Sequence, residues 1–273
     1  MGEKRGVSFE LIHGDCVAGM REHLADESVD LVVTSPPYNL GINYGKYEDK
    51  LEREDYLAWS LEWAAEVKRV LKPDGSLFLN VGAAPKNPMM PHEIILALRE
   101  LFVLQNTIHW IKSITVETRG GEQISAGHFK PINSQRYIND CHEYLFHLTK
   151  DGKVPVQRKA VGVPYQDKSN ISRWGHTGGD DLRCRGNNWF IPYKTIKARA
   201  TQRPHPATFP VELAERCLLL HGKGAETVML EPFLGIGHAA EAARRYGVKA
   251  FYGFEIDEDY LAVARERILG RLL

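Results

Sequence analysis

Four consecutive residues, Ser35-Pro36-Pro37-Tyr38, combine a hydroxyl group, two prolines and an aromatic ring. They directly follow residues 29–34, a largely apolar run with the composition of a buried strand. Proline fixes φ and lacks a backbone N–H, so the chain must leave this strand in an extended turn whose carbonyls can accept hydrogen bonds. A serine oxygen, a carbonyl and an aromatic face at the carboxyl end of a strand can together hold a flat heterocycle by its amino group and its ring.

A second stretch that could bind a ligand lies near the other end of the chain, at Glu231-Pro232-Phe233-Leu234-Gly235-Ile236-Gly237. Residues 227–233 have the pattern of a central strand, and a helix is expected over residues 239–246. Gly235 and Gly237 then form the tight turn between them, in which the backbone can approach a ligand at the helix N-terminus. Glu255 follows the next strand, predicted over residues 250–254, where a carboxylate can accept hydrogen bonds from two ribose hydroxyls.

Together these stretches resemble the motifs of the S-adenosylmethionine-dependent amino-methyltransferases, which modify the exocyclic nitrogen of cytosine or adenine in nucleic acid. Residues 34–38 are similar to the catalytic motif of that family, and residues 231–237 are similar to its glycine loop. The catalytic motif comes first and the cofactor loop last, an order that resembles the circularly permuted beta class of bacterial restriction-modification systems. The resemblance covers nearly the whole chain outside residues ~115–200.

The resemblance implies S-adenosyl-L-methionine as the cofactor. It assigns the cofactor contacts to Asp15, Phe209, Glu231, Pro232, Phe233, Gly235, Gly237 and Glu255. Asp15 is implied to lie beside the adenine, although its place after a strand over residues 9–12 equally predicts the N-cap of a helix, and both roles can hold. His205-Pro206 and Phe209-Pro210 resemble the pair that opens a helix beside the methionine end of the cofactor. The family usually has a small hydroxyl residue after the second glycine, so the contacts of His238 stay open.

The implied catalytic residues are Ser35, Pro36, Pro37 and Tyr38. The amino group of a base would donate to the Ser35 hydroxyl oxygen and the Pro36 carbonyl, and Tyr38 would stack on the ring. No metal is required, and a base in duplex DNA would have to flip out of the helix. Serine at the first motif position resembles the cytosine-N4 members, with N6-adenine DNA methylation and rRNA N4-cytidine methylation as alternatives. The intact motif argues against a silent nucleic-acid-binding subunit.

The whole chain has 273 residues, of which 43% are hydrophobic and 26% charged, values typical of one large globular domain. No apolar run approaches the roughly 18 residues that cross a bilayer, and no signal peptide is predicted, so a cytoplasmic protein without a membrane partner is expected. The cysteines form no Cys-x-x-Cys pair, which predicts reduced thiols and no zinc site; they are Cys16, Cys141, Cys184 and Cys217.

Strand and helix patterns alternate along the chain, which predicts an α/β, doubly wound, mostly parallel Rossmann-like sheet. Further strands are expected over residues 76–81, 106–111 and 143–148, and helices over residues 52–71, 91–101, 211–221 and 257–269, with Asp257 as an N-cap. A single methyltransferase domain would span residues 1–273. Its catalytic half would be residues 1–114 and 140–152, its cofactor half residues 204–273, and residues 115–203 would contain the target-recognition insertion. Trp59 and Trp63 are expected to pack in the core.

Basic residues are concentrated between Lys153 and His205, where eleven Lys and Arg stand against three acids, a net charge of +8 in a chain whose formal net charge is zero. Aromatic residues interleave with them, a mixture typical of nucleic-acid surfaces. We therefore expect phosphate contacts from Arg173, Arg183, Arg185, Lys194, Lys197 and Arg199. DNA is the expected partner, with RNA as the alternative. The resemblance also allows a cognate restriction endonuclease and a homodimer.

Overall fold

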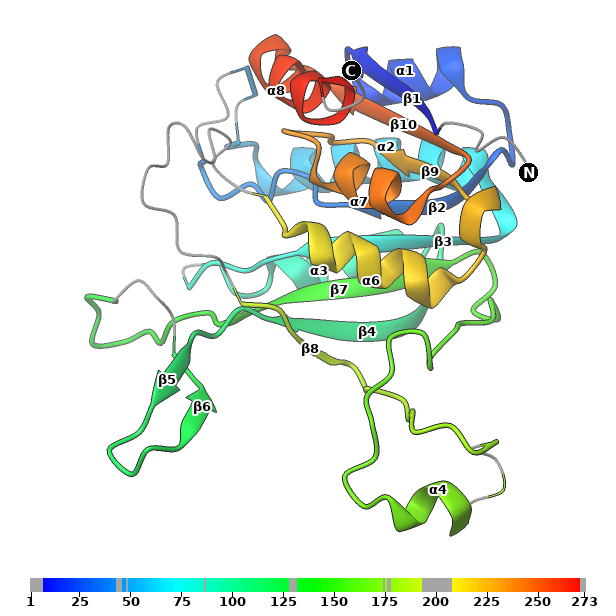
Figure 1. Cartoon of the computed structure of the whole chain (residues 1–273). Helices are drawn as coiled ribbons and strands as arrows, with labels where there is room; N and C mark the ends of the chain where they lie inside the picture. The colour runs from blue at the N-terminus through cyan, green and yellow to red at the C-terminus, as the bar shows by residue number, and fades with distance from the viewer. Residues whose placement is uncertain are drawn as a thin grey trace.

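The computed structural model describes residues 7–42, 46–47, 49–85, 87–127, 132–173, 175, 178–192 and 208–270. Within them the chain forms an eight-stranded sheet in the order β1-β10-β9-β2-β3-β7-β4-β8 (Figure 1). Its strands are β1 (Ser8–His13), β2 (Val29–Thr34), β3 (Leu71–Val81), β4 (Val103–Ile111), β7 (His142–Thr149), β8 (Asn188–Phe190), β9 (Val228–Glu231) and β10 (Ala250–Glu255).

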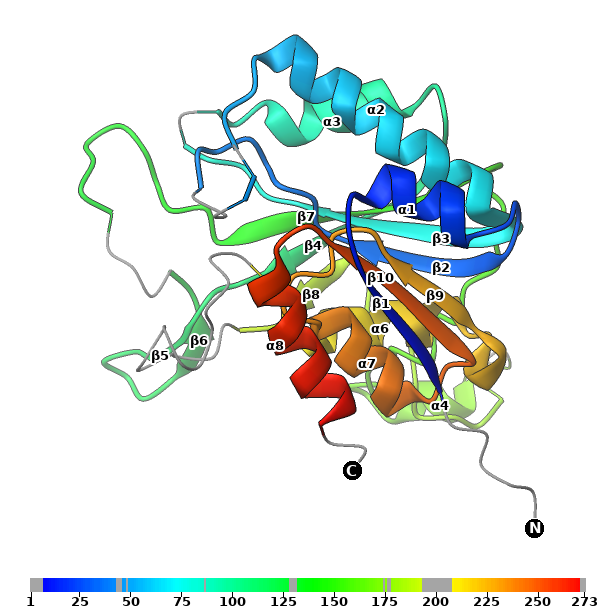
Figure 2. The same ribbon diagram turned by 90° about the horizontal axis from the view of Figure 1, so that it is seen from above.

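Helices cover both faces of this sheet (Figure 2). One face carries α1 (Cys16–His23), α2 (Arg53–Val70) and α3 (Met90–Leu98). The other face carries α6 (Val211–His221), α7 (His238–Tyr246) and α8 (Glu258–Leu269). The short α4 (Ser169–Arg173) and the 3-10 turn η2 (Gly224–Glu226) lie in connections. The layered α/β architecture predicted from the sequence is confirmed.

The strand directions explain why the sheet is mixed. The strands β1, β10, β9, β2 and β3 run parallel, whereas β7 lies antiparallel between β3 and β4. No helix separates β4 from β7 in the described chain; a hairpin of β5 (Thr115–Glu117) and β6 (Gln123–Ser125) lies there instead. Without a crossover helix, two strands adjacent in sequence pair antiparallel.

Side chains alternate between two cores on either side of the sheet. In β2, Leu31 and Val33 belong to the core under α6 and α7, and Val32 belongs to the core under α1 and α2. All six residues of β2 are buried. Burying each apolar side chain of this size contributes roughly 1.5–3 kcal/mol, so β2 is held from both faces and fixes the start of the turn at Ser35.

A buried carboxylate anchors β2 at the opposite end from Ser35. Asp30 is 1% exposed and accepts hydrogen bonds from Lys72 and Lys223 and from the Val228 backbone N–H. Burial alone would raise the pKa of Asp30, but the hydrogen bonds from Lys223, Val228 and Lys72 outweigh it and the pKa is lowered. The ionised carboxylate thus ties together the starts of β2 and β9.

Two parts of the sheet differ from the sequence prediction. The third strand begins at Leu71 rather than at residue 76, because Leu71 pairs with Val29 and a register shift accommodates the extra residues 72–75. β8 was not predicted. Only three residues of β8 pair with β4, too few for the sequence to show a strand period. The pairing buries Trp189.

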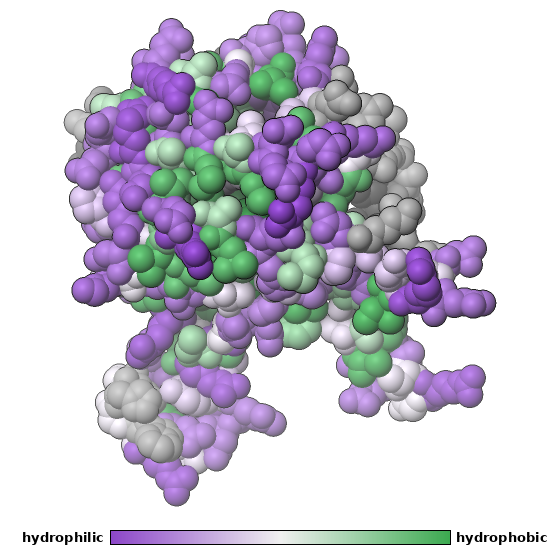
Figure 3. All heavy atoms as spheres, turned by 180° about the vertical axis from the view of Figure 1, so that it is seen from behind, coloured by the Kyte–Doolittle hydropathy of each residue, from purple (hydrophilic) through white to green (hydrophobic). Residues whose placement is uncertain are grey.

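The face covered by α1, α2 and α3 is mostly hydrophilic, with hydrophobic side chains gathered near its middle (Figure 3). In α3, Ile94 and Leu98 are buried while Leu96 is 58% exposed. Among the described residues, no helix is long and apolar enough to span a membrane.

Candidate active site

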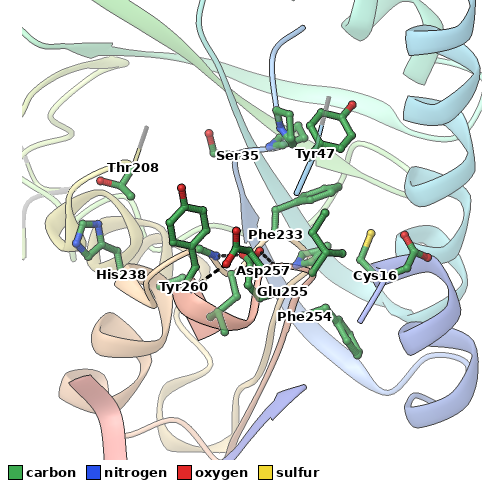
Figure 4. Close-up of a pocket in the computed structure, with 18 of the residues that line it drawn as sticks. Cys16, Ser35, Tyr47, Thr208, Phe233, His238, Phe254, Glu255, Asp257 and Tyr260 are labelled. Carbon is green, nitrogen blue, oxygen red and sulfur yellow. Dashed lines mark hydrogen bonds between the residues drawn. The ribbon is translucent and has the colours of Figure 1, made fainter. Parts of the chain in front are cut away.

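A cavity opens at the edge of the sheet where β1, β2, β9 and β10 have their carboxyl ends (Figure 4). Open α/β sheets bind their ligands at this edge. With the space at its mouth included, the cavity has a volume of about 1040 Å³. Ligand pockets measure roughly 300–1,000 Å³, so a nucleoside-sized ligand fits. The cavity brings together the two stretches singled out in the sequence.

The turn after β2 supplies one wall of the cavity. Ser35, Pro36, Pro37 and Tyr38 all line it, and the Ser35 Oγ lies 2.6 Å from the Tyr38 Oη. The Tyr56 hydroxyl donates to the Pro37 carbonyl at 2.7 Å. Within the described chain no donor reaches the Pro36 carbonyl, which therefore keeps its capacity to accept from a ligand.

The Tyr38 hydroxyl is held from behind the cavity wall. Asn80 of β3 donates to it at 2.6 Å, and it donates to Glu143 of β7 at 3.2 Å. Lys112 donates to the same Glu143 carboxylate at 2.8 Å. These three residues were not predicted, because their contacts join distant parts of the chain and leave no local pattern.

The glycine turn after β9 forms the floor. Pro232, Phe233 and Gly235 line the cavity. Gly235 has φ 54° and Gly237 has φ 79°, both in the left-handed region where glycine is favoured. The Gly235 backbone N–H donates to the Glu255 Oε2 at 2.7 Å. Gly237 does not line the cavity; it is the N-cap residue of α7.

Glu255, at the tip of β10, joins the turn to the entry of α8. Its Oε2 accepts from Gly235 and its Oε1 accepts from the Asp257 N–H at 2.9 Å. Burial raises the pKa of Glu255, although these backbone hydrogen bonds oppose the rise. Each carboxylate oxygen can accept more than one hydrogen bond, so Glu255 can still bind a hydroxyl group in the cavity.

Two aspartates that line the cavity are helix N-caps. The Asp15 Oδ1 accepts from the Val17 and Ala18 N–H groups, as predicted for an N-cap, and the Asp257 Oδ1 accepts from the first turn of α8. The capping bonds of Asp15 use one carboxylate oxygen, so Oδ2 can accept from a ligand.

Glu231 lies outside the cavity lining, although the resemblance assigns it a cofactor contact. It is 1% exposed and accepts from the Thr34 hydroxyl at 2.5 Å and from the Phe233 N–H at 3.2 Å. Burial raises the pKa of Glu231 well above its usual range. It therefore ties the end of β2 to the turn after β9 from beneath the cavity.

Aromatic rings that sequence reasoning missed line the cavity around Phe233. Trp59 was expected in the core, but it lines the cavity with its ring 5.5 Å from the ring of Phe233. Trp63, fully buried, packs edge-on against Phe233 at 5.6 Å, as expected for core packing. Tyr47 also lines the cavity and lies 5.7 Å from Trp59. One turn of α2 separates the two tryptophans, so periodicity alone could not assign them to different environments.

The opposite side of the cavity carries Thr208, His238 and Tyr260, with Glu255 and Asp257 between the two sides (Figure 4). None of the three was predicted as a site residue. His238 contacts the Phe209 carbonyl through Nδ1 at 2.7 Å, and a carbonyl only accepts, so Nδ1 carries the proton. Phe209 lines the cavity too, which places the entry of α6 beside the start of α7.

The described part of the basic window begins at the other end of the sheet and returns along β8, which runs parallel to the last residues of β4. Lys150 pairs with Glu27 before β2, and the Gln157 N–H donates to the Leu220 carbonyl at the end of α6. Figure 1 shows α4 on the right of the molecule, whereas hairpin β5–β6 lies on the left. The connection bearing this hairpin begins at Lys112, which donates to the same Glu143 carboxylate as Tyr38. The connection therefore leaves the sheet at the end that carries the cavity.

The expected phosphate-binding residues differ in exposure. Arg173 and Arg183 are exposed. Arg185 is half-buried, and its Nε donates to the Val161 carbonyl at 2.8 Å. Burial and the nearby Arg216 lower the pKa of Arg185. The other residues of this group lie outside the described residues; they are Lys194, Lys197 and Arg199.

No group of three or more His, Cys, Asp or Glu side chains that could hold a metal ion occurs among the described residues. All four cysteines are free thiols, and Cys16 lines the cavity. Burial and the adjacent Asp15 raise the pKa of the Cys16 thiol well above its usual value.

Comparison with known proteins agrees with the geometry of the site. A family model described as DNA methylase, N6_N4_Mtase, matches residues 29–266. The type II methyltransferase M.ScaI of Streptomyces caespitosus is 30% identical over 270 residues, which cover 96% of this chain and 80% of M.ScaI.

Two solved structures show the same fold. The cytosine-N4-specific PvuII DNA methyltransferase has a TM-score of 0.71 at 20% identity, over 96% of this chain and 86% of that protein. TTHA0409 of Thermus thermophilus, solved with S-adenosyl-L-methionine, has a TM-score of 0.61 at 26% identity, over 97% and 93% of the two chains. The chain therefore belongs to the DNA methylase family that transfers a methyl group from S-adenosyl-L-methionine to cytosine N4 or adenine N6, and it is a DNA methyltransferase of the restriction-modification type.

Proposed function

We propose that this DNA methyltransferase methylates the exocyclic N4 of cytosine. The observation that carries the proposal is the serine at the first position of the motif, whose hydroxyl lies on the cavity wall beside Tyr38. Serine at this position is typical of cytosine-N4 members, and the similar PvuII enzyme is named as cytosine-N4-specific. Adenine N6 is the second candidate, because the matched family model covers both bases.

The residues of the turn after β2 would activate the amino nitrogen of the base. That nitrogen is a poor nucleophile, because its lone pair is delocalised into the ring. Hydrogen bonds from the amino group to the Ser35 oxygen and the Pro36 carbonyl would favour a pyramidal nitrogen and direct its lone pair at the donor methyl. The Pro37 carbonyl already accepts from Tyr56, so it is the Pro36 carbonyl that serves the base. Tyr38 would stack on the ring.

The rest of the cavity fits S-adenosyl-L-methionine, which supplies a methyl group on a positively charged sulfur. Glu255 would accept from the ribose hydroxyls and the Asp15 Oδ2 from the adenine amino group, with Phe233 packing on the adenine. Phe209 and Gly235 would border the methionine portion. Glu231 and Gly237 would act indirectly, since they shape the glycine turn from outside the cavity lining.

A base paired in duplex DNA cannot reach this turn. Tyr38 is only 7% exposed and Ser35 is half-buried, so the target nucleotide must leave the stack and enter the cavity. Flipping costs a few kcal/mol, which contacts around the cavity mouth would have to offset. An enzyme that modifies the DNA of its own cell would act in the cytoplasm, alongside a cognate endonuclease.

Two surfaces could make the phosphate contacts. Target recognition within residues 115–203 is part of the proposal, and the hairpin connection that begins at Lys112 leaves the sheet at the cavity end, where Arg119 and Arg136 are exposed. The proposal for Arg173, Arg183 and Arg185 has less support from their position, because none of the three lines the cavity and the Arg185 Nε already donates to the Val161 carbonyl.

Nucleoside analysis tests the base and the polymer together. The protein is incubated with methyl-labelled S-adenosyl-L-methionine and duplex DNA, single-stranded DNA or rRNA, and the products are digested to nucleosides. The proposal predicts N4-methyldeoxycytidine from DNA. Label only in N6-methyldeoxyadenosine would establish the second candidate, and label only in rRNA would refute DNA as the substrate.

A further inference from the structure

A buried polar chain connects Lys112 to Ser35 through three side chains. Lys112 donates to the Glu143 Oε1 at 2.8 Å, and the Asn80 Nδ2 lies 2.6 Å from both the Glu143 Oε2 and the Tyr38 Oη. The Tyr38 Oη lies 3.2 Å from the Glu143 Oε2 and 2.6 Å from the Ser35 Oγ. Of these five hydrogen-bonded side chains, only Ser35 and Tyr38 line the cavity.

The chemistry of the members fixes most of the proton positions. The Glu143 carboxylate can only accept and the Lys112 ammonium can only donate. Asn80 faces both Glu143 and Tyr38, and its amide nitrogen must point towards them, because an amide oxygen would repel the carboxylate. Asn80 Oδ1 then has no hydrogen-bond partner within the described structure. An unpaired buried acceptor is costly, which is typical of an arrangement kept for function.

Tyr38 has one hydroxyl proton, and its hydroxyl oxygen has three hydrogen-bonding neighbours among the described residues. Asn80 donates to its oxygen, and Glu143 can only accept, so the Tyr38 proton points to Glu143. The remaining contact, to Ser35, is then closed by the Ser35 hydroxyl donating to Tyr38. The Ser35 proton is thereby turned away from the base, and the lone pairs of the Ser35 Oγ are left to accept from the amino group.

We propose that Lys112, Glu143 and Asn80 are positioning residues that set Ser35 as a hydrogen-bond acceptor before the base arrives. This inference rests on amino-group methylation as proposed above, for either base. The unmethylated amino group donates, so a Ser35 hydroxyl that pointed its proton at the base would oppose activation of the nitrogen. The negative charge of Glu143, held by Lys112, determines which atom donates in each hydrogen bond between Glu143 and Ser35.

The fold leaves little room for this chain to rearrange. Glu143 is 9% exposed and Tyr38 is 7% exposed. A Cβ added at Gly82 would come within 3.0 Å of the Glu143 Cγ and 3.1 Å of the Tyr38 Cε2. The absence of a side chain at Gly82 thus provides the space in which Glu143 and Tyr38 meet.

Glu143→Gln keeps the size of the side chain and removes the acceptor that orients these hydrogen bonds. The amide oxygen of the new side chain must face Lys112, so its NH2 group faces Tyr38 and the Asn80 amide nitrogen. Tyr38 thereby loses the carboxylate that holds its proton and is released to donate to Ser35, which turns the Ser35 proton to the base. Tyr38→Phe keeps the stacking ring and removes only the hydroxyl that accepts from Ser35. Glu93→Gln is the matched control, because Glu93 pairs with Arg53 on the surface, outside the cavity lining.

Single-turnover methyl transfer is measured at saturating S-adenosyl-L-methionine and DNA, together with the affinity for each. We expect Glu143→Gln and Tyr38→Phe to lower the saturated rate roughly 10- to 100-fold with both affinities within about twofold of wild type. Glu93→Gln should match wild type. If Glu143→Gln does not fold, Tyr38→Phe decides alone.

A saturated rate equal to that of wild type in the folded variants, with or without weaker binding, would overturn the inference and leave these residues a structural role. The wild-type protein is assayed in parallel. Its failure to methylate any amino nitrogen would refute the proposed function instead, so the two failures are distinguishable.

Discussion

Glu255→Gln tests the proposed cofactor half of the cavity. The Glu255 carboxylate accepts from two backbone N–H groups, those of Gly235 and Asp257, on separate oxygens. A glutamine has one oxygen and one NH2 group, so one of these N–H groups loses its acceptor and meets a donor. The charge that would bind the ribose hydroxyls is lost as well.

The expected loss follows from the strength of one hydrogen bond to a charged group, roughly 1.5–3 kcal/mol. The dissociation constant for S-adenosyl-L-methionine should therefore rise roughly 10- to 150-fold. Isothermal titration calorimetry measures this constant. Glu241→Gln is the control, because Glu241 is a buried carboxylate of α7 that pairs with Arg245 and does not line the cavity.

The pH dependence sharpens the test. Burial raises the pKa of Glu255, so cofactor affinity of the wild type should fall as pH is lowered through that raised value, and the glutamine variant should lack this decrease. A folded Glu255→Gln protein that binds the cofactor within twofold of wild type would refute the placement of the ribose.

Three further predictions concern stability and DNA binding. His147 and His221 both contact the Ser76 hydroxyl in the core, and burial lowers the pKa of each to about 4. Unfolded histidine titrates near 6.5, so the unfolded state binds more protons below that pH. As the pH falls from 7 to 5, each histidine should lower the free energy of unfolding by about 2 kcal/mol. The raised pKa of Glu255 and Glu231 acts in the opposite direction, so the check is urea unfolding of His221→Gln against wild type, and equal pH dependence would contradict the assignment. Asp30→Ala leaves Lys72 and Lys223 without their buried partner and should lower the unfolding free energy by about 3 kcal/mol. Its cofactor affinity should not change, since Asp30 lies at the far end of β2; weaker binding by a folded variant would contradict this separation. In a salt series with duplex DNA, Arg119→Ala or Arg136→Ala should each flatten the log-log slope by about 0.9 if the cavity-end connection contacts phosphates. Changes confined to Arg173→Ala and Arg183→Ala would instead support the basic window.

The sequence predicted the parts of the site that depend on local geometry. A strand followed by Ser35-Pro36-Pro37-Tyr38, a glycine turn before a helix, and aspartates at helix starts each leave a signature within a few residues. The structure places Ser35, Asp15, Gly235 and Glu255 around one cavity. The parallel strands β2 and β9 end at the same edge of the sheet, which brings distant stretches together.

The parts that were missed depend on contacts across the sheet. Asn80, Lys112 and Glu143 lie on three different strands or strand ends, and each residue alone is an ordinary polar position. Trp59 lines the cavity and packs against Phe233 of the glycine turn, a contact with a part of the chain far away in sequence. Charge composition could identify a basic window, but it could not indicate where along the sheet the residues of the window lie.

The central claim is that the turn after β2 acts on the amino nitrogen of the base while the rest of the cavity binds the cofactor. The single-turnover rate of methyl transfer by Ser35→Ala, at saturating DNA and S-adenosyl-L-methionine, tests it most directly. The loss of one preorganised hydrogen bond to the reacting group should lower this rate roughly 100-fold. A Ser35→Ala protein that transfers the methyl group at the wild-type rate would contradict the claim.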